Sequence, residues 1–281
     1  MFSHRLARRV TLGETQRERW DALCVQNLCV QNLRGQDPRV QNPRGLGASG
    51  DGPRGHDPGD GGRPGDRERR RFALSRGLVQ SAVAEFLGES GPDLVLDARC
   101  PSCGGPHGPL VLGLSPSASS ASSAPTVPSL SLSTSEDVIV VAVSDDARLG
   151  VDVEVLFSAR RGVASGDVAR RVRDVAAVLD MDAGNERDVL QRWVRVEAVL
   201  KADGRGLRVD PCDVSVIEED ADDQDHDNHH DQDDDGGAGP ATGSRRWRAT
   251  VRDDADVVYR GSDLALAPGI VGAVAWHAEL R

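Results

Sequence analysis

The chain has 281 residues, enough for one large domain or two small ones, and it contains no run of about 18 apolar residues that could span a membrane. Its formal net charge of −11 is concentrated in residues 218–235, which hold 11 carboxylates and no lysine or arginine; without them, 34 acidic and 34 basic residues remain. A neutral remainder with few aromatic residues, and no basic stripe beyond Arg67 to Arg71, argues against nucleic-acid binding.

The N-terminal region lacks the features of an export signal. Residues 1–20 carry basic side chains but no apolar core of the kind that secretory signals contain. The five cysteines are an odd number without a repeating framework, which is typical of a reducing compartment. We therefore expect a cytoplasmic protein.

Three low-complexity tracts interrupt the sequence. Residues 24–66 begin as a short repeat and become rich in Gly, Pro and Asp, residues 115–129 are rich in Ser, Ala and Pro, and residues 218–235 are acidic. Such compositions bury too little apolar surface to offset the entropy of ordering. We expect all three to be disordered insertions, the last a solvated loop whose histidines make only unspecific metal contacts.

The remaining pieces alternate between helix and strand. Apolar residues recur every three to four positions in 72–87 and 166–181, which predicts helices. Asn185 can cap a further helix that runs to about residue 202 and that Gly204 ends. Strands are predicted at 94–98, 110–114, 138–143, 150–155, 213–217, 246–252, 255–259 and 270–276. This order recurs in two similar halves, which indicates an α+β protein with lobes at 1–149 and 150–281.

The predicted strand 150–155 reads GVDVEV and carries the first candidate site. Because side chains alternate along a strand, the three valines share the core face, and Asp152 and Glu154 share the other. Two carboxylates held together by a rigid strand repel each other unless a cation lies between them, and oxygen ligands suit Mg²⁺. The alternative interpretation of an isolated D-x-E is a solvated strand face.

The second candidate site lies in the helix within RWVRVEAVLKADGRGL, residues 192–207. It contains Lys201, the only lysine of the chain, four residues after Glu197 and on the same helical face. An exposed Glu–Lys pair at this spacing is usually a weak ion pair. A chain that otherwise uses arginine has reason to keep a compact ammonium where it must reach one phosphate oxygen in a narrow site. Glu197 would then complete a metal site with Asp152 and Glu154.

Together, GVDVE and WVRVEAVLK followed by GRGL resemble the signature of the 4′-phosphopantetheinyl transferases, in the larger monomeric class that activates peptide and polyketide synthases. Weaker similarity covers residues 66–78, 100–108 and 131–135 and the final AVAW strand. The resemblance implies two similar α/β lobes in a pseudo-twofold arrangement, in a monomer that uses Mg²⁺ and coenzyme A. The implied partner is an apo acyl or peptidyl carrier protein, which receives phosphopantetheine on a serine.

The resemblance also implies roles for individual residues. Asp152, Glu154 and Glu197 would hold Mg²⁺. Glu197 would help to remove the serine proton, and Lys201 would neutralise phosphate charge as 3′,5′-ADP departs. The positions implied to face the coenzyme are Arg71, Arg76 and Ser133.

The chain departs from the family pattern at four points, each of which lacks a cation that is usual there: Gln80, Thr134 and Val196 stand in place of basic residues, and no basic residue lies between Gly108 and Pro109. Loss of several charge-assisted contacts leaves an alternative open, a catalytically weak relative that binds a carrier domain without efficient transfer. A third hypothesis is an unrelated metal-binding or nucleic-acid-binding protein.

Two smaller motifs have alternative interpretations. Cys100, Cys103 and His107 resemble half of a zinc site, but no fourth ligand follows at a suitable spacing. Gly204 and Gly206 suggest either a phosphate-binding loop or, more simply, a helix cap followed by a turn.

Overall fold

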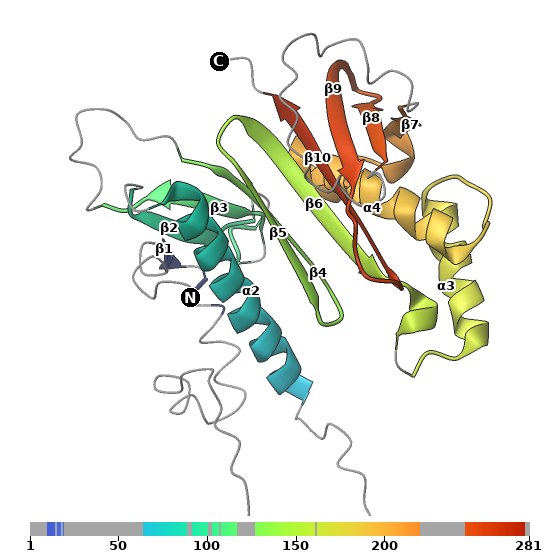
Figure 1. Cartoon of the computed structure of the whole chain (residues 1–281), viewed down its shortest axis with the longest axis horizontal. Helices are drawn as coiled ribbons and strands as arrows, with labels where there is room; N and C mark the ends of the chain where they lie inside the picture. Colours follow the sequence, from blue (N-terminus) through green and yellow to red (C-terminus); the bar gives the residue numbers. More distant parts are fainter. Residues whose placement is uncertain are drawn as a thin grey trace, which may run out of the picture.

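A computed structural model describes residues 10–14, 16, 17, 19, 64–88, 92–100, 103–106, 108–116, 127–160, 162–219 and 245–278. These residues form a mixed α and β protein without a barrel (Figure 1). Within them, no helix combines the length and the apolar character needed to cross a membrane. Most of the three low-complexity tracts, including the acidic residues 220–235 and their histidines, lies outside the described residues.

The strands within the described residues form three separate sheets. Only the first two strands pair in parallel, and all other pairs are antiparallel. The first sheet has the order β1 (Val10–Leu12), β2 (Leu94–Ala98), β3 (Leu110–Leu114), and the second is the hairpin of β4 (Ser129–Ser135) and β5 (Val138–Ser144). The third has the order β6 (Ala147–Val155), β10 (Ile270–Ala278), β9 (Asp254–Asp263), β8 (Arg246–Val251), β7 (Val214–Glu218).

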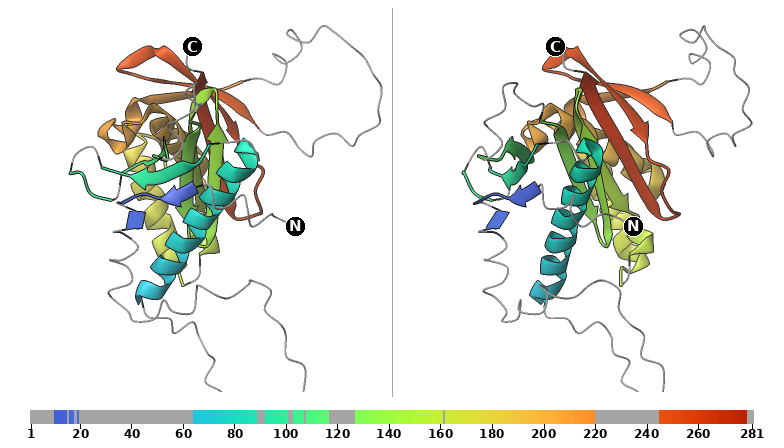
Figure 2. Two further views of the ribbon diagram at one scale, coloured as in Figure 1. Left: turned by 90° about the vertical axis from the view of Figure 1, so that its left-hand side faces the viewer. Right: turned by 60° about the vertical axis from the view of Figure 1, so that its left-hand side comes forward.

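The sheets are covered by the helices α2 (Pro64–Leu87), α3 (Ser165–Val178) and α4 (Glu186–Asp203). The ends of α4 follow from local chemistry, as predicted. The Asn185 side chain accepts the Asp188 N–H at 3.0 Å, and Gly204 takes the left-handed conformation, φ 84°, that ends the helix. β4, β5 and β6 lie between α2 on one side and α3 and α4 on the other (Figures 1 and 2).

The hydrophobic core is divided in two. One cluster is built on Val79 and Val83 of α2 and on Leu94 and Leu96 of β2. The other lies between α3, α4 and the five-stranded sheet, and its largest fully buried side chain is Trp247. β6 contacts the β4–β5 hairpin as well as α4 and β10, so it joins the two halves of the chain.

The boundaries of three expected segments need correction. α2 begins at Pro64, inside the tract expected to be an insertion, and β4 begins at Ser129, where the Ser/Ala/Pro tract was expected to end. Glu218 ends β7 and pairs with Arg195, so it belongs to the sheet and not to an acidic loop. On α2, the apolar residues do not share one face: Val79 and Val83 are buried, whereas Leu74 is 65% exposed.

Candidate functional site

The site begins where α4 crosses β6 at close range. A Cβ atom added to Gly150 would lie 2.0 Å from the Ala198 carbonyl oxygen and 2.7 Å from the Lys201 Cβ, so no side chain fits between the helix and the strand. This close approach brings Lys201 over the strand that carries Asp152. The glycine of GVDVEV therefore has a packing role in placing helix and strand residues together.

We expect Gly150→Ala to destabilise the fold by about 1–3 kcal/mol, because the added methyl group meets helix backbone that cannot move aside alone. Gly113→Ala in β3 is the matched control, since a Cβ there meets no atom within 4 Å. Urea unfolding of both variants measures the difference. Equal stability of the two variants would show that α4 moves away from β6 at little cost.

Asp152 and Glu154 of β6 and Glu197 and Lys201 of α4 line one cavity of about 350 Å³, together with Leu132, Ser133, Thr134 and Trp193. The structure thus gathers the candidate residues of both motifs in one place. Asp152 is buried, which overturns the alternative of a solvated strand face. The burial is possible because the Ser133 hydroxyl and the ammonium of Lys201 replace water at one oxygen of the carboxylate.

Two cationic side chains form ion pairs with carboxylates of this cluster. The Lys201 Nζ donates to Asp152 Oδ1 at 2.6 Å and to the Val151 carbonyl oxygen at 3.0 Å. Arg160, which the sequence did not single out, donates through Nη2 to Glu154 Oε2 at 2.6 Å. The partner of Lys201 is therefore Asp152, across the helix–strand contact, in place of the weak helical pair with Glu197.

The cluster still carries an excess of negative charge, because three carboxylates face two cations. Asp152 Oδ2 is buried and has no hydrogen-bond partner among the described residues. Burial raises the pKa of Glu197, and the negative charge of Asp152 adds to this effect more than Lys201 offsets it. Burial likewise raises the pKa of Glu154, against the lowering by the Ser135 hydrogen bond and Arg160. A further cation would relieve this excess of negative charge.

A carboxyl group whose pKa is higher in the folded than in the unfolded state stabilises the fold at low pH, and this contribution is lost as the pH rises through the folded-state pKa. In EDTA we therefore expect Glu197→Gln to be more stable than the wild type at pH 8, with the difference shrinking towards pH 4. Urea unfolding across this pH range measures the difference in the free energy of unfolding, and Glu85→Gln, at an exposed position, is the control. A difference that does not change with pH would contradict the electrostatic cause.

The chemistry of these groups fits a hard divalent cation. Carboxylate oxygens are the ligands that Mg²⁺ takes in proteins, and the unpartnered Asp152 Oδ2 is a ready donor. Across the described part of the chain, however, no set of three His, Cys, Asp or Glu side chains is close enough to hold a metal ion. The magnesium site, and equally a zinc site at Cys100 and Cys103, therefore stay predictions; His107 lies outside the described residues.

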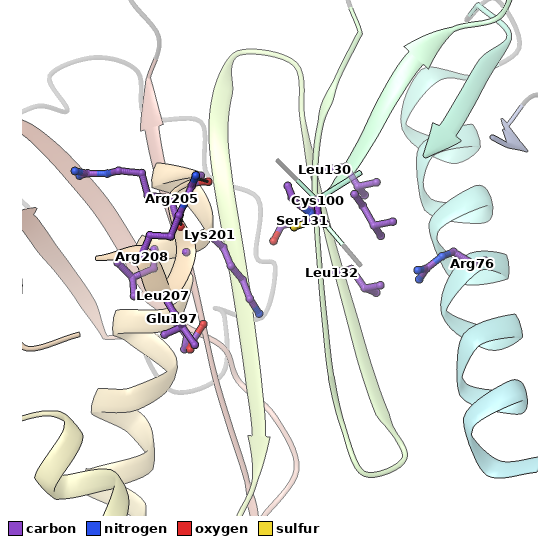
Figure 3. Close-up of a pocket in the computed structure, with 16 residues that line it drawn as sticks. Arg76, Cys100, Leu130, Ser131, Leu132, Glu197, Lys201, Arg205, Leu207 and Arg208 are labelled. Atoms are coloured by element: carbon purple, nitrogen blue, oxygen red, sulfur yellow. Dashed lines mark hydrogen bonds between the residues drawn. The ribbon is translucent and has the colours of Figure 1, made fainter. Parts of the chain in front are cut away.

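A larger cavity of about 780 Å³ shares Leu132, Glu197 and Lys201 with the first. Figure 3 shows Arg76 on α2 at one side of it, and Glu197, Lys201, Arg205, Leu207 and Arg208 at the other, with Leu130, Ser131 and Leu132 of β4 between them. Arg205 and Leu207 belong to the GRGL segment, and Arg208 follows it directly. Both halves of the chain thus contribute to this cavity.

Arg76 is the cation of α2 that faces the larger cavity. It is buried, its Nε donates to Gln16 at 2.6 Å, and its guanidinium carbon lies 4.4 Å from the centre of the Phe72 ring. Burial and the charge of Arg19 lower its pKa to about 10. Since no carboxylate among the described residues forms an ion pair with it, this guanidinium would gain from a bound anion.

Two of the residues implied to face the coenzyme are placed differently from Arg76. Arg71 is half-buried and is not among the residues that line either of the two cavities. Ser133 lines the smaller cavity, where its hydroxyl contacts Asp152. The two serines on either side of it, Ser131 and Ser135, lie in a segment similar to the family, but alternating serine is not a recognised site signal and predicts no role for them.

No protein-family model matches the chain, and no curated protein matches its sequence. The features of the chain that point to a function are the two adjoining cavities, one rich in carboxylates and the other bordered by arginines.

Proposed function

We propose that the protein transfers the 4′-phosphopantetheine group from coenzyme A to a serine of an acyl or peptidyl carrier protein. The observation that carries the proposal is that Asp152, Glu154, Glu197 and Lys201 line one cavity, which shares Leu132, Glu197 and Lys201 with a larger cavity bordered by arginines. A carboxylate cluster next to a cation-rich cavity suits a diphosphate ester and a metal ion. The signature that the two motifs resemble belongs to enzymes with this reaction.

The proposed reaction forms a bond from the carrier serine oxygen to the β-phosphorus of coenzyme A and breaks the phosphoanhydride bond, which releases 3′,5′-ADP. Glu197 accepts the serine proton; its raised pKa, caused by burial and by Asp152, makes it a better base than an ordinary carboxylate. Lys201 offers its ammonium to a phosphate oxygen. When bound, Mg²⁺ would supply charge neutralisation of the diphosphate, held by Asp152, Glu154 and Glu197.

The coenzyme would bind in the larger cavity. Arg76 offers a buried guanidinium for a phosphate group, and Arg205 and Arg208 lie on the opposite wall. This placement supports the two-lobe arrangement, with lobes at 1–149 and 150–281 and the coenzyme between them. Since one chain supplies both walls, we propose that the protein acts as a monomer, which sedimentation can test.

The test is to incubate the protein with coenzyme A, Mg²⁺ and an apo carrier domain, and then to weigh the carrier by mass spectrometry. Gain of one phosphopantetheine group is the expected result, and it should require Mg²⁺. A carrier that co-purifies with the protein but stays unmodified would support the alternative, a catalytically weak relative that binds carrier domains. A carrier neither bound nor modified would contradict the proposal.

Lys201→Arg should fold normally and transfer phosphopantetheine at least about 10-fold more slowly. The wide, planar guanidinium group cannot replace the compact ammonium group in a narrow site. The Lys201 Nζ is held between the Val151 carbonyl and Asp152, beside the tight contact at Gly150. Arg187→Lys, an exposed exchange on the same helix, should leave the rate unchanged. A Lys201→Arg variant with the wild-type rate would assign Lys201 a structural role only.

A further inference from the structure

β4 is joined to β6 by side chains and not by strand pairing. Three alternating serines of β4 accept hydrogen bonds from three backbone N–H groups of β6: Ser131 from Val151 at 3.0 Å, Ser133 from Val153 at 3.3 Å, and Ser135 from Val155 at 3.0 Å. All three serines are buried. β4 itself pairs with β5, and β6 pairs with β10 on its other edge. The serines therefore satisfy backbone donors that would otherwise be buried without partners.

Two of the three serines also bind a carboxylate of the candidate site. The Ser133 hydroxyl donates to Asp152 Oδ1 at 2.7 Å, and the Ser135 hydroxyl donates to Glu154 Oε2 at 2.6 Å. A serine hydroxyl has one proton, so the N–H bond from the strand uses a lone pair and directs that proton to the carboxylate. Ser131 makes the same bond to β6, and no carboxylate contact is found for it among the described residues.

The consequence is a defined orientation for each carboxylate. Ser133 and Lys201 both donate hydrogen bonds to Oδ1 of Asp152. Oδ2, the buried oxygen without a partner, is left free to coordinate a metal ion. Ser135 and Arg160 both occupy Oε2 of Glu154. In each case a hydroxyl from β4 and a cation hold one oxygen of the carboxylate, so the other oxygen is available to a ligand.

We propose that Ser133 and Ser135 are positioning residues, which hold Asp152 and Glu154 in the orientation that binds a divalent cation. The identity of the cation rests on the proposed function. The role of the two serines in orienting the carboxylates goes beyond that function. Partners that orient the ligands of a metal matter greatly for affinity, and their loss typically weakens binding by about 10- to 100-fold. A purely structural role predicts instead that all three serines behave alike, since each makes the same bond to β6.

The experiment measures Mn²⁺ affinity by electron paramagnetic resonance, with no coenzyme or carrier present, for the wild type and for Ser131→Ala, Ser133→Ala and Ser135→Ala. Urea unfolding of the same variants is measured in EDTA. We expect similar losses of stability in all three variants, because each loses one hydrogen bond to β6. Mn²⁺ binding should weaken about 10-fold or more in Ser133→Ala and Ser135→Ala, and should stay within about twofold of the wild type in Ser131→Ala.

Ser133→Thr keeps the hydroxyl and should retain Mn²⁺ affinity near that of the wild type, which separates loss of the hydrogen bond from disturbance of the strand. If Ser133→Ala does not fold, Ser135→Ala carries the test, because Glu154 is only half-buried. Equal Mn²⁺ affinity in the wild type and both alanine variants would overturn the inference alone. A wild type that binds no Mn²⁺ would overturn both the role of the serines and the proposed metal site. The proposed function is decided separately, by the mass of the carrier protein after incubation with coenzyme A.

Discussion

Glu197→Gln is expected to lower the rate of Mg²⁺-dependent phosphopantetheine transfer by about 10²-fold or more while the protein stays folded. The amide keeps the shape of the side chain but neither accepts a proton nor contributes charge to a metal site. Glu197 is the one carboxylate of the three for which neither Lys201 nor Arg160 is an ion-pair partner in the described structure. It is therefore the group of the cluster best placed to act as a base.

The measurement is the initial rate of carrier modification at saturating coenzyme A and Mg²⁺, with circular dichroism to show that the variant is folded. Glu85→Gln, an exposed exchange on α2, should transfer at the wild-type rate. Asp152→Ala should also abolish transfer. Near-normal turnover of a folded Glu197→Gln variant would remove this residue from the proposed chemistry, whatever the role of its neighbours.

Asp263→Ala should lower the free energy of unfolding by about 3 kcal/mol, since it removes the buried partner of Arg195 and leaves that charge only the half-exposed Glu218. Arg195, on α4, is only 6% exposed and binds Asp263 of β9 through two hydrogen bonds of 2.8 and 2.7 Å. Its third contact is Glu218 of β7 at 2.7 Å, and Trp247 also donates to Asp263. This network ties the helix that carries Glu197 and Lys201 to the far strands of its sheet.

The matched control is Asp167→Ala, which removes the exposed ion pair with Arg170 on α3 and should change stability by less than about 1 kcal/mol. Urea unfolding followed by tryptophan fluorescence measures both variants. Replacing both partners, as Arg195→Met with Asp263→Leu, should cost less than Asp263→Ala alone, because no buried charge is then left unpaired. Glu218 is half-exposed and stays near Arg245. A loss below about 1 kcal/mol in Asp263→Ala would mean that Arg195 finds water or another acceptor.

Local signals in the sequence determined the elements that carry the site. The alternation in GVDVEV, the Asn185 cap and the Gly204 stop depend on residues a few positions apart, and the strand and the helix lie where these signals place them. The pairing of the two motifs came from their resemblance to a family, and the cavity that they share depends on the tight approach at Gly150. The close contact needs a glycine, but the sequence alone does not say which helix it meets.

The tertiary structure alone decided the partners of the charged groups. Arg160 binds Glu154, and Arg195 binds one carboxylate on β7 and one on β9. Lys201 binds Asp152 and not Glu197, the glutamate four residues before it. These contacts span from 6 to 68 positions in the chain, so no local pattern encodes them.

β4 shows the same limit for a strand. By alternation, its leucines are expected to face the core, and Leu130 and Leu132 do pack against the cluster of α2 and β2. The more deeply buried side chains are nevertheless the serines of the opposite face, because they bind the backbone of β6 in place of strand pairing. A polar side chain is buried only where it has a hydrogen-bond partner, and here another strand of the folded protein supplies that partner.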